Sequence, residues 1–237
     1  MSDYALEATN LTLRYAKAPA LDGVNLQLPQ GKIIGLLGPN GSGKTTFIKL
    51  AAGLLTPTSG QLTVCGEKIG VASKAVVSYL PDRPCFRKNQ RVNQILTMFG
   101  DFYADFDRNR AEEMLRSLGI DPAQRFRTLS KGTQEKVQLV LVMSRRAKLY
   151  LLDEPIGGVD PAARDYILNT IICNYDPRAT ILISTHLISD VERVLDEFVF
   201  LYEGKILQSG NADEIREESG KSLDELFREV FKCLGNS

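Results

Sequence analysis

Residues 38–46 of this 237-residue chain read Gly38-Pro39-Asn40-Gly41-Ser42-Gly43-Lys44-Thr45-Thr46. They match G-x-x-x-x-G-K-[ST], a loop whose curled backbone aims several N–H groups at the phosphates of a nucleotide. Its glycines reach the positive-φ conformations that such a curl needs. We expect Lys44 to bring a positive charge to the β- and γ-phosphates, and the Thr45 hydroxyl to bind Mg²⁺. The stretch therefore predicts a site for a nucleoside triphosphate.

The residues on either side of this loop supply the context that the pattern requires. Lys32–Leu37 is a short apolar run and predicts a buried strand. After the loop, apolar residues recur at helical spacing, at Phe47, Ile48, Leu50, Ala51 and Leu54. A helix that begins at the loop adds its N-terminal dipole and unpaired N–H groups to the phosphate site. Strand, loop and helix in this order favour a phosphate-binding core over a glycine-rich surface turn.

Composition and charge narrow the range of possible functions further. At 43% apolar and 24% charged residues the chain has an ordinary globular make-up, and its formal net charge is zero. A neutral chain gives no general electrostatic reason to bind nucleic acid, so we expect no nucleic-acid partner. The cysteines lie far apart without a C-x-x-C pair, which indicates reduced thiols of a cytoplasmic protein; they are Cys65, Cys85, Cys173 and Cys233.

Two kinds of targeting segment are not expected. The N-terminus, residues 1–4, lacks the basic and apolar regions of a signal peptide. No apolar run approaches the 18 residues of a membrane-spanning helix. Any role in membrane transport therefore has to be exercised through a partner.

The order of patterns along the chain predicts an α/β fold. Residues 6–34 alternate in short runs separated by turn signals, among them Asp22-Gly23, and predict an antiparallel β-layer. Residues 61–64 and 75–80 predict two further strands. From about residue 89 to 146 the pattern becomes helical, with Met98 and Phe102 in one apolar stripe. We interpret this stretch as a helical insertion into the core.

Strand character returns after the insertion. Residues 149–152 and 180–184 predict strands, and a helix over roughly 161–175 joins them, so they should be parallel. Residues 198–201 and 205–207 flank Glu203-Gly204 and predict a hairpin. The last helix has an apolar stripe that we expect to dock on the body of the protein rather than in a membrane, since its polar face carries both acids and bases; the stripe is Leu223, Leu226, Phe227, Val230 and Phe231.

A pair of acids marks the second half of the predicted site. The apolar strand 149–152 stops at Asp153-Glu154. Open α/β sheets bind ligands at the carboxyl ends of their strands, and a phosphate loop needs a carboxylate for Mg²⁺ and a group that orients the attacking water. We assign Asp153 to Mg²⁺ and Glu154 to the water. The chain's one histidine, His186, follows strand 180–184 and should reach the γ-phosphate or the water from the same edge.

Taken together, these motifs resemble the ATP-binding subunit of an ABC transporter across nearly the whole chain. Residues 38–46 match the family's Walker A loop, and 149–154 its Walker B strand with the catalytic glutamate. The resemblance implies that Tyr15 stacks on adenine, that Asp160 lies in the D-loop (residues 157–160) and that His186 is the switch histidine. It implies ATP and Mg²⁺ as ligands.

Residues 129–133, Leu129-Ser130-Lys131-Gly132-Thr133, stand at the family signature LSGGQ. From the residues alone, Ser130 is a helix N-cap. The resemblance implies that Ser130 and Gly132 contact the γ-phosphate held by a second subunit. It thus implies a head-to-tail dimer, either a homodimer or a pair with a close paralogue, that encloses two nucleotides.

The chain departs from the family pattern in two places. In the signature, Lys131 replaces a glycine and Thr133 replaces the glutamine, and elsewhere Asp82 stands where the family has glutamine. We expect Asp82 still to reach Mg²⁺, directly or through water. Both departures resemble subunits that serve export-type permeases. Nearby lies a basic cluster that is either a solvated loop or a surface for a permease helix or acidic lipid headgroups; its members are Arg83, Arg87, Lys88 and Arg91.

We therefore predict a P-loop NTPase core with a mostly parallel sheet, an N-terminal antiparallel β-layer and an inserted α-helical subdomain. Residues 1–86 and 147–210 should form the ATP-binding core, 87–146 the helical subdomain and 211–237 a helical tail of one domain. The expected function is ATP hydrolysis that powers a separate integral-membrane permease, for efflux, from the inner face of the cell membrane. A soluble ABC-type ATPase in cofactor assembly or another non-transport role is the alternative.

Overall fold

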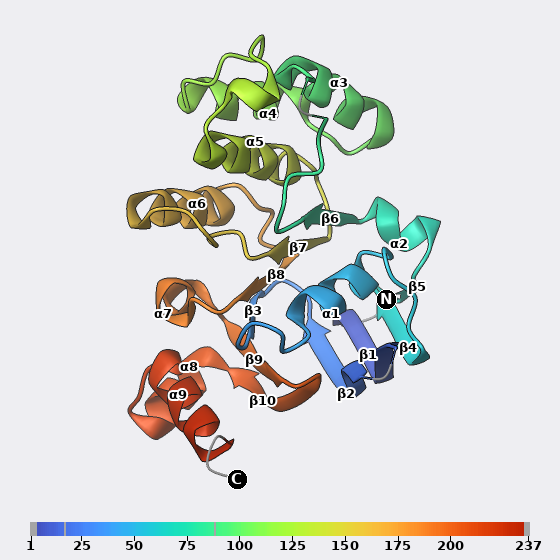
Figure 1. The fold of residues 1–237 in the computed structure, drawn as a ribbon, viewed down its shortest axis with the longest axis vertical. Coiled ribbons are helices and arrows are strands. Elements are labelled where there is room, and N and C mark those ends of the chain that lie inside the picture. The colour runs from blue at the N-terminus through green and yellow to red at the C-terminus, as the bar shows by residue number, and fades with distance from the viewer. Residues whose placement is uncertain (1–3, 17, 88, 235–237) are drawn as a thin grey trace.

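The computed structural model describes the backbone of residues 4–16, 18–87 and 89–234, with the side chains of residues 161–163 and 232–234 excluded. Its centre is a six-stranded sheet in the order β10-β9-β3-β8-β7-β6 (Figure 1). Neighbouring strands are parallel except for the β9–β10 hairpin. The strands are β3 Ile33–Leu37, β6 Val77–Leu80, β7 Leu149–Asp153, β8 Thr180–Thr185, β9 Glu197–Tyr202 and β10 Lys205–Asn211. The expected mostly parallel sheet is confirmed.

A second, antiparallel sheet has the order β2-β1-β4-β5. It confirms the predicted N-terminal layer and its turn at Gln30-Gly31, but the turn predicted at Asp22-Gly23 is wrong. Asp22-Gly23 lies inside β2 as a bulge, because Gly23 takes a φ of 64° and the pairing shifts between Leu11–Val24 and Leu13–Leu21. The bounds are β1 Tyr4–Tyr15, β2 Ala18–Pro29, β4 Ser59–Val64 and β5 Glu67–Lys68.

Helix α1 (Lys44–Ala51) joins the two sheets. Phe47 and Ile48 are fully buried in one apolar cluster with side chains from both sheets, which fixes the loop that precedes the helix. Leu54 does not continue this stripe, contrary to the spacing. The chain turns at Gly53, whose φ is 67°, and Leu54 is left exposed. The strand predicted from residue 75 also begins later, because a short helix, α2 (Val71–Ala75), precedes β6.

Three α-helices stand between β6 and β7: α3 (Val92–Phe102), α4 (Arg108–Ser117) and α5 (Lys131–Met143), with a 3₁₀ turn, η1 (Phe126–Thr128), before the last. They form the block at the top of Figure 1. Their apolar faces share a second core cluster with the other face of the central sheet. Phe102 is not buried, although its spacing placed it in the same apolar stripe as Met98. It is the last residue of α3 and is 78% exposed, while Met98 packs against the core.

The remaining helices share this cluster and cover the rest of the same face of the central sheet (Figure 1). They are α6 Pro161–Cys173, α7 Ile188–Val191 with the 3₁₀ turn η2 Glu192–Val194, α8 Ala212–Ser219 and α9 Leu223–Leu234. The predicted docking of the last helix is confirmed, since the ring centroids of Phe227 and Phe200 lie 5.3 Å apart and those of Phe231 and Tyr202 lie 5.0 Å apart. In the part of the chain that the structure describes, every helix is too short or too polar to cross a membrane.

Candidate active site

The loop at residues 38–43 folds around the side chain of Lys44. Its buried Nζ donates hydrogen bonds to the carbonyl oxygens of Gly38 at 2.8 Å and Pro39 at 3.0 Å, and lies 3.6 Å from Oε1 of Glu154. Burial lowers the pKa of Lys44, while the nearby Glu154 and Asp153 carboxylates oppose that shift. The protein thus holds this ammonium with its own oxygens, in the place where phosphate oxygens would compete for it.

Two glycines of the loop are required by the close approach of other strands. Gly43 takes a φ of 110°, and a Cβ there would lie 2.5 Å from the Ala20 carbonyl oxygen. A Cβ on Gly38 would lie 2.2 Å from the carbonyl oxygen of Leu201. The loop is therefore clamped between β2 and the end of β9, so the direction of its N–H groups is set by the fold.

Asp153 ends β7 beside the first turn of α1. Its Oδ1 accepts hydrogen bonds from the Thr45 hydroxyl at 3.0 Å and the Ser184 hydroxyl at 2.7 Å. Its Oδ2 is buried and has no hydrogen-bond partner. Burial raises the pKa of Asp153 against the effect of these two hydrogen bonds. A buried carboxylate oxygen that lacks a partner, next to a threonine hydroxyl, fits the oxygen ligands that Mg²⁺ takes.

Glu154 follows on a strained backbone, with a φ of 49°. Its N–H donates to the Ser184 carbonyl at 3.0 Å, and its Oε2 accepts from the Thr185 hydroxyl at 3.1 Å. The Nδ1 of His186 lies 3.1 Å from both carboxylate oxygens. These contacts exist because β7 and β8 are parallel neighbours in register, Asp153 opposite Ser184, so their carboxyl ends meet.

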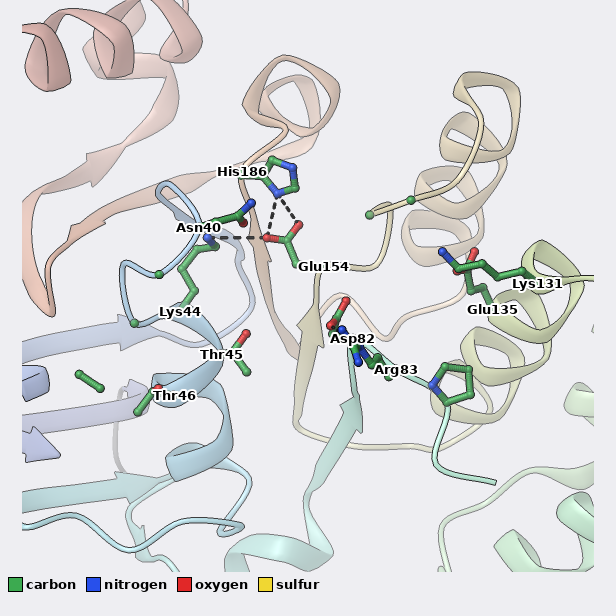
Figure 2. A pocket seen from close by; sticks show the side chains of 16 residues that line it. Asn40, Lys44, Thr45, Thr46, Asp82, Arg83, Lys131, Glu135, Glu154 and His186 are labelled. Carbon is green, nitrogen blue, oxygen red and sulfur yellow. Dashed lines mark hydrogen bonds and ion pairs between the residues drawn. The ribbon is translucent and has the colours of Figure 1, made fainter. Parts of the chain in front are cut away.

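These groups open into one cavity of about 680 Å³. Figure 2 shows the phosphate loop, Glu154 and His186 on one side and Lys131 and Glu135 from α5 on the other, with Asp82 and Arg83 between them. Of the predicted site residues, those that line it are Asn40, Gly41, Gly43, Lys44, Thr45, Thr46, Asp82, Glu154 and His186.

Other predicted site residues lie outside the lining. Gly38, Pro39, Ser42 and Asp153 sit behind it within the loop and strand. Tyr15 ends β1 with its side chain 54% exposed, and Ser130 caps α5, where its Oγ accepts from the Thr133 N–H at 3.2 Å. Gly132 follows in the first turn of α5, and Asp160 is exposed just before α6. Within this single chain, none of these last four residues lines the cavity.

The cavity also includes charged residues that sequence reasoning did not assign to the site. Lys131 and Glu135 are an i,i+4 pair with Nζ and Oε1 3.7 Å apart. Arg83 comes from the loop after β6. The helical spacing of Lys131 and Glu135 was visible in the sequence, but their approach to the phosphate loop depends on how α5 packs. The predicted basic cluster is split: Arg83 faces the nucleotide cavity, Arg87 lines a second hollow, Arg91 donates to the Ala123 carbonyl, and Lys88 lies outside the described residues.

That second hollow is an open groove of about 970 Å³ between the helical block and the central sheet. Exposed apolar side chains, Leu54 and Phe102, stand in it, and its basic lining residues are Lys49, Lys74, Arg87 and Arg145.

Arg145 ties the two walls of this groove together. Its buried guanidinium pairs with both oxygens of Asp105, at 2.9 and 3.1 Å, and stacks on the Tyr103 ring with its Cζ 3.9 Å from the centroid. It also donates to the carbonyls of Ala75 and Val77, beside and within β6.

Comparison with known proteins agrees with this site. The model of the ABC transporter family matches residues 21–157. ABC transporter ATP-binding protein YxlF of Bacillus subtilis is 31% identical over 218 residues, which cover 90% of this chain and 73% of YxlF. Lantibiotic transport ATP-binding protein SrtF of Streptococcus pyogenes is 29% identical over 231 residues, which cover 94% of this chain and 95% of SrtF. A solved ATP-binding subunit of an ABC transporter aligns with a TM-score of 0.84 at 29% identity, covering 96% of this chain and 99% of that one.

A phosphate loop, strand-end carboxylates and a histidine that meet at one sheet edge define a P-loop nucleotide hydrolase. This chain belongs to the ABC transporter family. It is an ATP-binding and ATP-hydrolysing subunit of such a transporter, and the expected fold class and enzyme activity are confirmed.

Proposed function

We propose that this chain hydrolyses ATP with Mg²⁺ to drive efflux through a separate permease, working as a head-to-tail pair at the inner face of the cell membrane. The observation that carries the proposal is the joint lining of one cavity by Lys44, Glu154 and His186. Efflux is favoured by the similarity to a lantibiotic transport subunit along nearly the whole chain, and by the departures at Lys131 and Asp82.

The proposed chemistry assigns one task to each group. Lys44 and the N–H groups of the loop bind the β- and γ-phosphates, and Tyr15 stacks on adenine. The Glu154 carboxylate accepts a proton from the water that attacks the γ-phosphorus, and His186 holds that carboxylate in place. Thr45, Asp153 and Asp82 would hold Mg²⁺, which neutralises charge on the phosphates when bound. Because Lys44 now pairs with Glu154, phosphate binding would also release the general base.

A second subunit would complete each site. Ser130, Gly132 and Asp160 lie beside the cavity of their own chain rather than in its lining. Subunits of this family pair with each other, and the N-terminus of α5 has the unpaired N–H groups and positive dipole end that a phosphate needs. We propose that these groups reach the nucleotide of the partner subunit, so that ATP closes the pair and hydrolysis opens it.

We propose that the groove beside α3 receives the permease. Its exposed Phe102 and Leu54 would pack on the apolar face of a cytoplasmic helix, and its rim of Lys49, Lys74 and Arg87 would favour acidic residues on that helix. The rim makes a helix with acidic residues the best fit. Acidic lipid headgroups alone would leave the apolar side chains without a partner.

Membrane recruitment tests this assignment. The tagged chain, expressed in its own host, should fractionate with membranes and co-purify with an integral-membrane protein. Phe102→Asp should lose that protein. Val71→Asp is the matched control, since Val71 is 90% exposed and outside the groove. Both variants should melt near the wild-type temperature. If the wild type binds no membrane protein, the cofactor-assembly alternative replaces the transport proposal.

Direction of transport needs its own test. Deleting the gene should sensitise the host to at least one member of a panel of peptide antibiotics, and the wild-type gene should restore resistance. Lys44→Ala should fail to restore it, because the phosphates lose their buried counter-ion. Unchanged sensitivity across the panel, in a strain where the membrane complex is present, would contradict efflux of this class of compound.

A further inference from the structure

Lys131 occupies an electrostatically unfavourable place. It is the first residue of α5, where Ser130 is the cap, and the first turn contains no acid. The N-terminal end of a helix carries partial positive charge, so acids stabilise it and a lysine adds like charge. A lysine at this position therefore raises the positive potential at the end of α5 at some cost to the helix itself.

The side chain of Lys131 reaches into the nucleotide cavity. It is 74% exposed, and its Nζ lies 3.0 Å from the point where a Cβ on Gly158 would stand. It lines the same cavity as Lys44 and Thr45 (Figure 2). The ammonium thus lies across the cavity from the phosphate loop, over the loop that follows Glu154.

The ion pair between Lys131 and Glu135 restrains the lysine only weakly. Its Nζ lies 3.7 Å from Oε1 of Glu135, which is longer than a hydrogen bond. The Glu135 side chain is only 18% exposed, and its Oε2 is buried without a partner. Such a pair restrains a flexible, well-hydrated ammonium little, so a phosphate can draw Lys131 away.

We propose that Lys131 is a phosphate-contacting residue of the ATPase, which leaves Glu135 and pairs with the terminal phosphate of ATP. The inference rests on the proposed function, which it deepens. The lysine that replaces a signature glycine would then add a positive charge to the phosphate site. The phosphate can belong to the nucleotide of the same chain, whose loop shares the cavity, or to that of a partner subunit.

Binding of a non-hydrolysable ATP analogue and of ADP tests the proposal. Lys131→Met keeps the length of the side chain and removes its charge, so the analogue should bind about tenfold more weakly while ADP binding changes little. Lys131→Arg should retain most of the affinity. Lys136→Met is the control, because Lys136 lies on the same helix but over the Tyr166 ring, 5.1 Å from its centroid.

Glu135→Gln separates phosphate binding from a structural role. If Glu135 merely competes for Lys131, removing its charge should tighten binding of the analogue, opposite in sign to Lys131→Met. If the ion pair instead supports the fold of α5, both variants should weaken binding alike, and this would overturn the proposal. Equal loss of ADP and analogue affinity in Lys131→Met would overturn it too.

Measurements at two protein concentrations identify the source of the phosphate. Weaker analogue binding by Lys131→Met at a concentration where the chain is monomeric would assign the contact to its own nucleotide. If Lys131→Met binds the analogue more weakly only at a concentration where the chain is dimeric, the Lys131 contact belongs to the nucleotide of the partner subunit. If the wild type binds neither nucleotide, the proposed function itself fails. If the wild type binds the analogue and Lys131→Met matches it in both states, this inference alone fails.

Discussion

The Nδ1 atom of His186 lies 3.1 Å from each carboxylate oxygen of Glu154. An ionised carboxylate only accepts hydrogen bonds, so Nδ1 is assigned as the donor. With the Thr185 hydroxyl on Oε2 and Lys44 near Oε1, Glu154 is held from three sides. The contacts with His186 and Thr185 do not involve the phosphate loop, so they orient Glu154 even when a phosphate draws Lys44 away.

Removing the charge of Glu154 should stop hydrolysis and spare binding. Glu154→Gln keeps the shape of the side chain but cannot accept the proton of water. We expect ATP turnover, measured as phosphate release, to fall about 10²–10⁴-fold. The variant should form a dimer in ATP by size-exclusion chromatography. Glu217→Gln, an exposed change on α8, is the control. Turnover at the wild-type rate in Glu154→Gln would show that another group is the base.

The unpartnered Oδ2 of Asp153 predicts a steep dependence on Mg²⁺. In Asp153→Asn, the Mg²⁺ concentration that half-saturates Mg²⁺-dependent ATP binding should rise by more than about 100-fold, because a charged ligand becomes neutral. Ser184→Ala removes the hydrogen bond to Oδ1 of Asp153 and should raise the half-saturating Mg²⁺ concentration by about tenfold. Calorimetric titration with Mg²⁺ measures both. An unchanged Mg²⁺ requirement in Asp153→Asn would place the ion elsewhere.

Two adjacent arginines should differ sharply in their contribution to stability. Arg145 is buried and paired with Asp105, whereas Arg146 is 75% exposed in its pair with Asp107. Arg145→Leu leaves a carboxylate and two carbonyls without their donor and should lower the free energy of unfolding by about 3 kcal/mol. Arg146→Leu should lower it by less than about 1 kcal/mol. Urea unfolding measures both, and equal losses would refute the role given to Arg145.

Glu135 should make stability fall as the pH rises. Burial raises its pKa above the ordinary 4.5, although Lys131 opposes the shift. The folded protein therefore binds this proton more tightly than the unfolded chain does, and its contribution is complete below pH 4.5 and lost as the pH rises through the raised pKa. The stability of Glu135→Gln relative to wild type should increase across that window in urea unfolding.

Asp107 provides a control of opposite sign. The Arg110 N–H and then the Arg146 side chain lower its pKa below 3.8, so its contribution is present above pH 3.8 and lost as the pH falls through the lowered value. Asp107→Asn should therefore lose stability relative to wild type at neutral pH, and this deficit should shrink on acidification. A pH-independent difference for Glu135→Gln, alongside the expected trend for Asp107→Asn, would contradict the burial of Glu135.

Local patterns predicted the parts of the site that depend on one strand or one loop. The phosphate loop, Asp153-Glu154 and His186 were recognised because each follows an apolar strand directly, and parallel strands bring such ends together. The hairpin at Glu203-Gly204 formed where its turn residues stand, since both take a positive φ.

Features that depend on packing between segments were not predictable in this way. Leu54 and Phe102 have the spacing of buried residues, yet the turn at Gly53 and the end of α3 leave them in a groove. The grouping of Asp82 with Lys131 and Glu135 depends on how α5 packs against the loop after β6. Helical periodicity specifies which side of a helix is apolar but not which distant charge its polar side meets.

The attachment of the helical block to the sheet has a mechanical consequence. The chain enters the block from β6 and returns through β7, two adjacent strands, and Arg145 ties the block to Val77 in β6 and to Ala75 at the end of α2. Both covalent crossings and this noncovalent tie lie along one edge. Away from that edge, Lys136 and Arg110 contact α6 and the residues that follow it. We expect a push received in the groove to turn the block about the β6–β7 edge against these contacts, and so to carry the N-terminus of α5 through an arc.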